Sequence, residues 1–154
     1  MPDKALLLCD LTNSLQPVKR AWQRAVSEVI AEYDISMSLA MLMVLVYRHP
    51  KGINQKLLAE ELGINPGALV RLLDQAAEEQ WLERCEVAGD RRVKTLHVLP
   101  RGTELAQKLV KVADELRQEL MADVSAEDIE CATRVLRQFE TRATEYVQQC
   151  KCDK

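Results

Sequence analysis

Apolar side chains recur every three or four residues in the first 33 positions, which places them on one face of a helix. The stripe comprises Leu11, Leu15, Val18, Trp22, Ala25, Val26, Val29, Ile30 and Tyr33. Pro17 interrupts it, so Pro17 marks either the first turn of a helix that begins near Ser14 or a kink in a longer helix. We therefore expect two helical stretches end to end. The next segment, Leu39 to Tyr47, is apolar on every side and predicts a buried helix, with Ser36 or Ser38 as its cap.

Two short helices are predicted next. Asn54 is placed to cap the first, which runs over residues 55–62 and ends at Gly63. Asn65 is placed to cap the second, which starts at Pro66 and extends to about residue 80. Ala59 is small enough for the two helices to pack closely, and the turn between them needs a positive φ that glycine supplies. The predicted core of this helix-turn-helix consists of Leu58, Leu62, Ile64, Leu69 and Leu72.

A β-hairpin and two long helices complete the pattern. Residues 82–87 and 95–99 alternate by two around a turn at 88–90, and Pro100 and Gly102 are expected to close the hairpin. The fifth helix carries a stripe of Leu105, Leu109, Val112, Leu116 and Leu120. The sixth starts at a capping box, Ser125 with Asp128, and its stripe is Ile129, Ala132, Val135, Leu136, Phe139 and Ala143.

This order predicts a mainly α fold with a small β-hairpin wing. Residues 36–100 form the winged helix-turn-helix lobe of a single chain, 1–154. So small a lobe cannot bury both outer stripes, so residues 1–33 and 101–149 are expected to pair with each other and with a second copy of the chain.

The composition fits a globular chain of 154 residues with an aliphatic core, since hydrophobic residues make up 47% and aromatic residues only 4%. The net charge is −3, which by itself disfavours a polyanionic partner such as DNA. The charge is uneven, however. Residues 84–101 hold five basic and two acidic residues, a net charge of +3, and a local basic face is compatible with DNA binding.

The second helix of a helix-turn-helix lies in the major groove with its N-terminal residues toward the bases. The candidate DNA-binding residues of the two helices are Gln55, Asn65, Gly67, Ala68 and Arg71. Arg71 is the candidate for a guanine or a phosphate, and Gly67 permits close backbone approach. The hairpin adds Arg84, Asp90, Arg91 and Arg92. Arg91 and Arg92 are expected at the tip, where a narrow minor groove attracts arginine, and Asp90 can hold the side chain of Arg92.

These residues resemble the MarR family, particularly its SlyA-like branch. The resemblance rests on Leu69–Gln75, Arg84, the Asp-x-Arg pattern at Asp90 and Arg92, Lys19–Trp22 and Ser125–Glu127. It implies a homodimer that binds double-stranded DNA at a pseudo-palindromic operator, usually as a repressor, often relieved by small phenolic or anionic ligands or by cysteine oxidation. The chain departs from the family at Gln80, where glycine is usual after the recognition helix. It also departs at Pro66–Ala68, where the family often has serine or threonine.

Other chemistry is less well supported by the sequence. Cys150 and Cys152 could bind a metal or form a redox pair, but the sequence favours two exposed thiols in a frayed C-terminal tail. Cys9 is a candidate redox sensor. Cys85 and Cys131 are expected to be structural. No metal cluster, cofactor motif or nucleophile motif is visible, so we expect no metal, no cofactor and no enzyme activity.

A ligand pocket is expected between the dimer helices and the DNA-binding lobe. Trp22, Arg24, Met41 and Tyr47 are its candidate lining, although ordinary core packing of the same residues is the interpretation that the sequence favours.

No signal peptide or membrane span is predicted, which favours a cytoplasmic protein without a membrane partner. Two other interpretations stay open. The chain is alternatively a winged-helix protein-interaction module without DNA binding, which its net charge favours, or a regulator that senses oxidation through Cys9.

Overall fold

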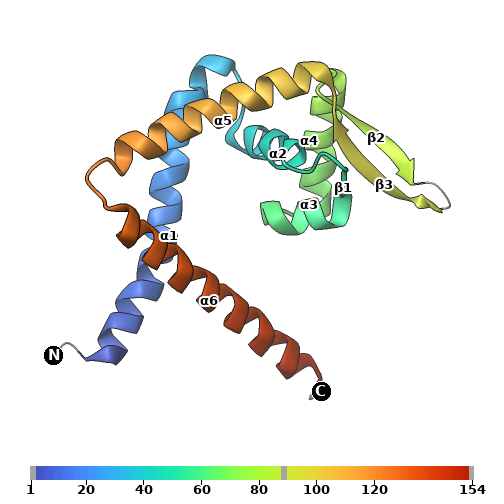
Figure 1. The fold of residues 1–154 in the computed structure, drawn as a ribbon. Coiled ribbons are helices and arrows are strands. Elements are labelled where there is room, and N and C mark those ends of the chain that lie inside the picture. Colours follow the sequence, from blue (N-terminus) through green and yellow to red (C-terminus); the bar gives the residue numbers. More distant parts are fainter. Residues whose placement is uncertain (1–2, 88–89, 153–154) are drawn as a thin grey trace. The chain divides into compact units, whose positions relative to one another are not determined.

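The computed structural model describes residues 3–87 and 90–152, and it describes no side chains for residues 87, 90–93 and 152. The chain divides into two compact units, Met1–Arg117 and Gln118–Lys154. The elements are mainly helical, with one small antiparallel sheet (Figure 1).

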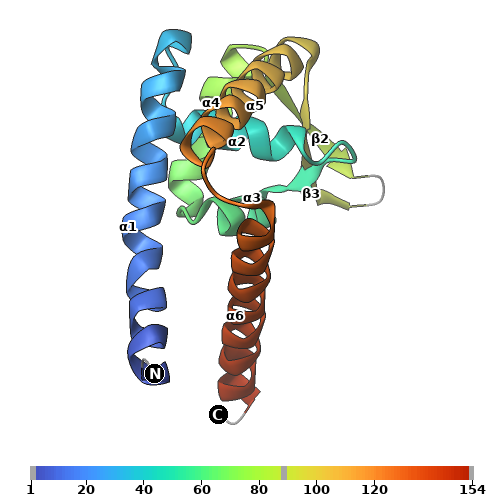
Figure 2. The same ribbon diagram turned by 60° about the vertical axis from the view of Figure 1, so that its left-hand side comes forward.

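The first helix, α1 (Lys4–Ile30), is one continuous helix (Figure 2), and Pro17 lies inside it. The Asp3 side chain caps it by accepting the N–H of Ala5 at 3.0 Å. Of the two alternatives for Pro17, the start near Ser14 is wrong and the longer helix holds. The expected two helical stretches are a single helix. Pro17 removes one backbone donor. The apolar stripe continues on both sides of Pro17, and the backbone stays helical on both sides as well.

The short helix η1 (Ala31–Tyr33) leads into α2 (Met37–Tyr47). Ser36, and not Ser38, caps α2, because its Oγ accepts the N–H of Leu39 at 3.2 Å. The helix lies at the centre of the core, as its all-round apolar sequence predicted. Its buried residues are Leu39, Ala40, Leu42, Met43 and Val46.

The sheet has three strands in the order β1-β3-β2, all antiparallel. They are β1 (Ile53–Asn54), β2 (Leu82–Val87) and β3 (Asp90–Val98). The strand β1 was not predicted, because two residues carry no local pattern and the strand exists only through pairing with distant Leu96. The second hairpin arm also begins five residues earlier than predicted, at Asp90 and not at Thr95.

The helices α3 (Gln55–Leu62) and α4 (Pro66–Glu78) lie between β1 and β2, as predicted. Residues from α1, α2, α3, α4, the sheet and α5 share one aliphatic core. Its largest fully buried side chains are Leu39, Leu42, Met43, Val46, Leu58, Leu69, Leu73, Leu82 and Leu96.

The helix α5 (Pro100–Leu120) begins directly after the sheet. Pro100 is its first residue and Gly102 lies inside it, so the expectation that the two close the hairpin was wrong. A Cβ on Gly102 would lie 2.0 Å from the backbone oxygen of Trp81. Gly102 is therefore required for α5 to pack against the start of β2. Leu120, the last member of the predicted stripe, is exposed.

The second unit consists of the end of α5, a turn and α6 (Ala126–Cys152). Ser125 and Asp128 form the predicted capping box. The Oγ of Ser125 accepts the N–H of Asp128 at 3.1 Å and donates to its Oδ2 at 2.7 Å. Every described side chain of α6 is exposed within the single chain, the apolar stripe included.

Candidate nucleic-acid interface

Two asparagine caps set the starts of the helix-turn-helix. The Oδ1 of Asn54 accepts the N–H of Leu57, and the Oδ1 of Asn65 accepts the N–H of Ala68, both at 2.8 Å. Each bond satisfies one of the orphan donors of a helix N-terminus. Pro66, at the first position of α4, has no N–H to satisfy.

The turn between the helices depends on Gly63. Its φ of 65° is in the left-handed region, where it lets Ile64 bond back to the carbonyl of Ala59 at 3.2 Å. Ala59 is buried at 8% exposure, as the close packing of α3 and α4 requires. Leu58 and Leu69 are fully buried and Leu62, Ile64 and Leu72 pack against the core, so the predicted core of this unit is confirmed.

The helix α4 has one buried and one exposed face. Leu69, Leu73 and Ala76 are buried. The exposed face carries Gly67, Val70, Arg71 and Asp74, at spacings of three and four residues. Gly67 and Arg71 were predicted to face DNA. Val70 was not considered, because an apolar side chain in a helix gives no sign of exposure until the helix is placed in the fold.

The other residues of the two helices that were predicted to contact DNA are less available for such a contact. Ala68 is half-buried, and its backbone N–H donates to the Oδ1 of Asn65. Gln55 is half-buried at the first position of α3. Asn65 is exposed, with one oxygen engaged as the cap.

Arg84 lies on β2, and its side chain reaches α4. Its Nη2 is 2.6 Å from the Oδ1 of Asp74. The sequence predicted Arg84 as a DNA contact but gave no partner for it, because the pair joins two elements through the fold. The pair neutralises a carboxylate that would otherwise present an unpaired negative charge on the exposed face of α4.

The wing is formed by β2 and β3, whose register shifts between Glu86 and Val87. Asp90, Arg91 and Arg92 are the first residues of β3, so Asp90 belongs to the strand and not to the predicted turn. Their side chains lie outside the described ones, as do residues 88 and 89. The predicted Asp90–Arg92 interaction is thus not described.

A cavity of about 260 Å³ lies in the first unit, between α1, α2, α3 and α5. Trp22 and Met41, two of the four candidate pocket residues, line it. The guanidinium of Arg117 lies 5.0 Å from the ring centre of Trp22 and is paired with Asp114. The cavity is therefore mostly apolar with a cation at its edge.

A second, more open cleft of about 870 Å³ lies against α1. Arg24 and Met41 line it, together with Lys19 and Arg20. Tyr47 lines neither cavity and is half-buried.

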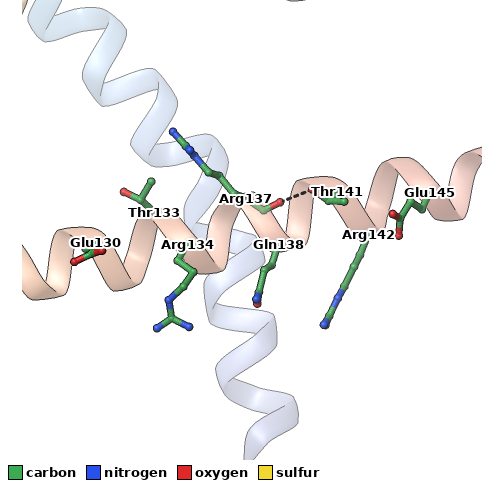
Figure 3. A pocket seen from close by; sticks show the side chains of 8 residues that line it. All are labelled: Glu130, Thr133, Arg134, Arg137, Gln138, Thr141, Arg142 and Glu145. Carbon is green, nitrogen blue, oxygen red and sulfur yellow. Dashed lines mark hydrogen bonds between the residues drawn. The ribbon is translucent and has the colours of Figure 1, made fainter.

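One face of α6 carries eight polar side chains, shown in Figure 3. They lie opposite the apolar stripe, and α6 alone supplies them: Glu130, Thr133, Arg134, Arg137, Gln138, Thr141, Arg142 and Glu145. Since no second element walls this surface, it is the solvated side of an amphipathic helix.

The thiols differ in environment. Cys9, Cys131 and Cys150 are exposed, whereas Cys85 on β2 is half-buried. Burial raises the pKa of the Cys85 thiol, and the charge of Glu83 adds to this. A raised pKa makes Cys85 a poor nucleophile, in keeping with a structural role. Among the described residues, no three His, Cys, Asp or Glu side chains are grouped to hold a metal ion.

Within the described part of the chain, no single helix is long and apolar enough to cross a membrane. Only α1 with η1 and α2 together reach such a length and composition, as a pair bent by 89°.

Residues 33–93 match the sequence model of the MarR family. This segment contains the helix-turn-helix and β2. This part of the chain is therefore similar in sequence to the MarR family.

Solved structures of this fold cover most of the chain. The transcriptional regulator PA3341 superposes with a TM-score of 0.82 at 21% identity, over 88% of this chain and 98% of the other. A mutant of MarR from E. coli complexed with operator DNA gives 0.72 at 20% identity, over 89% and 98%. The S. aureus MepR–DNA complex gives 0.72 at 18% identity, over 85% and 96%. The chain therefore has the MarR-like fold with long N- and C-terminal helices.

Proposed function

We propose that this protein binds double-stranded DNA in a sequence-specific manner through α4 and the wing. The observation that carries the proposal is the exposed face of α4. Gly67 and Arg71 lie there on a capped helix that packs against α3 around the fully buried Leu58 and Leu69. Arg84 of the wing strand is joined to the same face. Two proteins of the same fold were solved with DNA, which supports this use of the fold.

The charge distribution is consistent with binding by one face. The protein carries a net charge of −3, but residues 84–101 carry +3. A phosphate backbone attracts the local patch, and the negative remainder limits non-specific binding.

We propose a homodimer. The apolar stripe of α6 that includes Leu136 and Phe139 is exposed along the helix. The leucines at residues 6–8, in the first turns of α1, are exposed as well. Apolar surface of this extent marks an interaction site. A second copy of the chain is the occupant we favour, since a twofold dimer presents two recognition helices to a pseudo-palindromic operator with half-sites about 34 Å apart.

We propose repression, relieved when a small anionic aromatic ligand occupies the cavity beside Trp22. The indole offers a stacking surface and Arg117 a positive charge. Such a ligand acts by binding one dimer shape better than the other. Binding of a hydroxybenzoate is measurable through Trp22 fluorescence in a Trp81→Phe background. Oxidation of the exposed Cys9 is the alternative release mechanism, and its loss in Cys9→Ser distinguishes the two.

We propose that the chain belongs to the MarR family, on the match over residues 33–93, and to its SlyA-like branch, on the residues Asp90–Lys94 of the wing and Ser125–Glu127 before α6. We propose a cytoplasmic location as well, where a regulator meets its operator.

The test of the function is the salt dependence of DNA affinity, compared between the wild type and an Arg91→Ala/Arg92→Ala variant. A DNA-binding wing predicts weaker binding to every sequence. The slope of log affinity against log salt should also be shallower, by about 0.9 for each phosphate that the variant no longer neutralises. Unchanged affinity and slope would contradict the proposal and favour a protein-interaction module.

A further inference from the structure

Val70 is an apolar residue on the exposed face of α4. It is 40% exposed, whereas its neighbours Leu69 and Leu73 are fully buried. A β-branched side chain on an exposed helix face is a weaker helix former than alanine. Since Val70 contributes neither to the core nor to helix propensity, folding alone gives no reason for valine at this position.

The surroundings of Val70 leave its side chain accessible. Gly67, one turn before it, has no side chain, and a Cβ there would meet only the Asn65 Oδ1, at 3.4 Å. Asp74, one turn after it, is neutralised by Arg84. Val70 thus lies between a glycine without a side chain and a neutralised carboxylate, and Arg71 follows it in the sequence.

We infer that Val70 reads the methyl group of a thymine in each operator half-site, next to the base or phosphate contacted by Arg71. In the major groove, the C5-methyl of thymine is the apolar feature by which a base pair is distinguished, and apolar side chains contact it. The inference rests on the proposed DNA binding and deepens it, because it assigns one base of a sequence that is otherwise undefined.

The test uses a duplex selected by the full-length protein from a random library. Each thymine of the half-site is replaced in turn by uracil, which removes only the methyl group. We expect one position at which uracil weakens binding of the wild type about fourfold, the value for hiding one methyl group from water. Replacement in both half-sites should then weaken it about fifteenfold, because the two effects multiply.

Two variants make the test specific. Val70→Ala should bind the thymine and uracil duplexes equally, whereas Val70→Thr, which keeps one methyl group, should retain a preference for thymine. Because Val70 is exposed, both variants are expected to fold, and Val70→Ala should unfold at a slightly higher temperature because alanine is the better helix former. Equal binding of all uracil duplexes by the wild type would overturn the assignment of Val70, as would the same uracil penalty in Val70→Ala, while the proposed function would stand. Failure to select any sequence would overturn both.

Discussion

The guanidinium of Arg84 and the carboxylate of Asp74 are 2.6 Å apart, and this ion pair joins the first strand of the wing, β2, to α4. Both side chains are partly solvated, with exposed fractions of 32% and 52%. Such a pair contributes at most about 1 kcal/mol to stability. The pair acts mainly on orientation, because it ties together the two elements that we propose contact DNA and removes a free negative charge from the exposed face of α4.

Breaking this pair from either side is expected to give different results. Arg84→Ala leaves a free carboxylate facing the phosphates and should weaken binding to all DNA about tenfold. Asp74→Asn leaves Arg84 charged but without its ion-pair partner. Affinity for non-specific DNA should therefore persist, while the preference for the operator over a scrambled duplex should fall. Fluorescence anisotropy with operator and scrambled duplexes measures both. If the double variant shows effects that simply add, the pair has no coupled role.

Gly67→Ala is expected to separate folding from DNA binding. The fold has room for a Cβ at residue 67, and alanine in a helix restricts the unfolded chain, so stability should rise by about 0.5–1 kcal/mol. Affinity for DNA should fall about tenfold or more, because the added methyl group blocks close backbone approach. Thermal unfolding and DNA titration provide the two readouts.

Gly102→Ala is the matched control for this change. There the added Cβ meets the backbone of Trp81, so the same substitution should destabilise the fold. Undiminished DNA affinity in Gly67→Ala would show that this turn of α4 does not approach the duplex.

Gln80 adopts a left-handed conformation that glycine would adopt more readily. Its φ is 57°, and the helix end is closed by bonds from Gln80 to Ala77 at 3.0 Å and from Trp81 to Ala76 at 2.9 Å. Gln80→Gly should therefore raise the free energy of unfolding by about 1 kcal/mol, without affecting the exposed face of α4. Chemical denaturation measures the change, and a loss of stability would mean that the glutamine side chain makes a compensating contact.

Phe139→Glu is expected to dissociate the proposed dimer. Phe139 is at the middle of the apolar stripe of α6 and is 42% exposed in the single chain. A carboxylate buried between two copies would be strongly unfavourable. Gln138→Glu introduces the same charge on the opposite, polar face of α6 and should leave the assembly unchanged. Sedimentation equilibrium reports the mass, and an intact dimer in Phe139→Glu would place the interface elsewhere.

Much of the fold could be predicted from local sequence chemistry. The caps at Asn54 and Asn65, the turn glycine Gly63 and the capping box at Ser125 each act within a few residues, so their bonds are encoded where they occur. The left-handed residue after α4 is Gln80, the position at which the sequence departs from the glycine that is usual in the family.

The remaining features depend on distant pairing or on packing. The strand β1 exists only because Ile53 pairs with Leu96, and the Asp74–Arg84 ion pair forms only once β2 lies beside α4. Pro17 misled the prediction of α1 because a local penalty was outweighed by the helix on both sides of it. For the site, the sequence identified the exposed arginine but not the exposed valine, since exposure is a property of the folded helix.

The central claim is tested most directly by selecting DNA sites from a random duplex library with the purified protein at a stated salt concentration. We predict a pseudo-palindrome whose half-sites are centred about ten base pairs apart, one helical turn of DNA. Recovery of no sequence above background, with the protein folded and dimeric, would contradict the proposal that this chain recognises DNA.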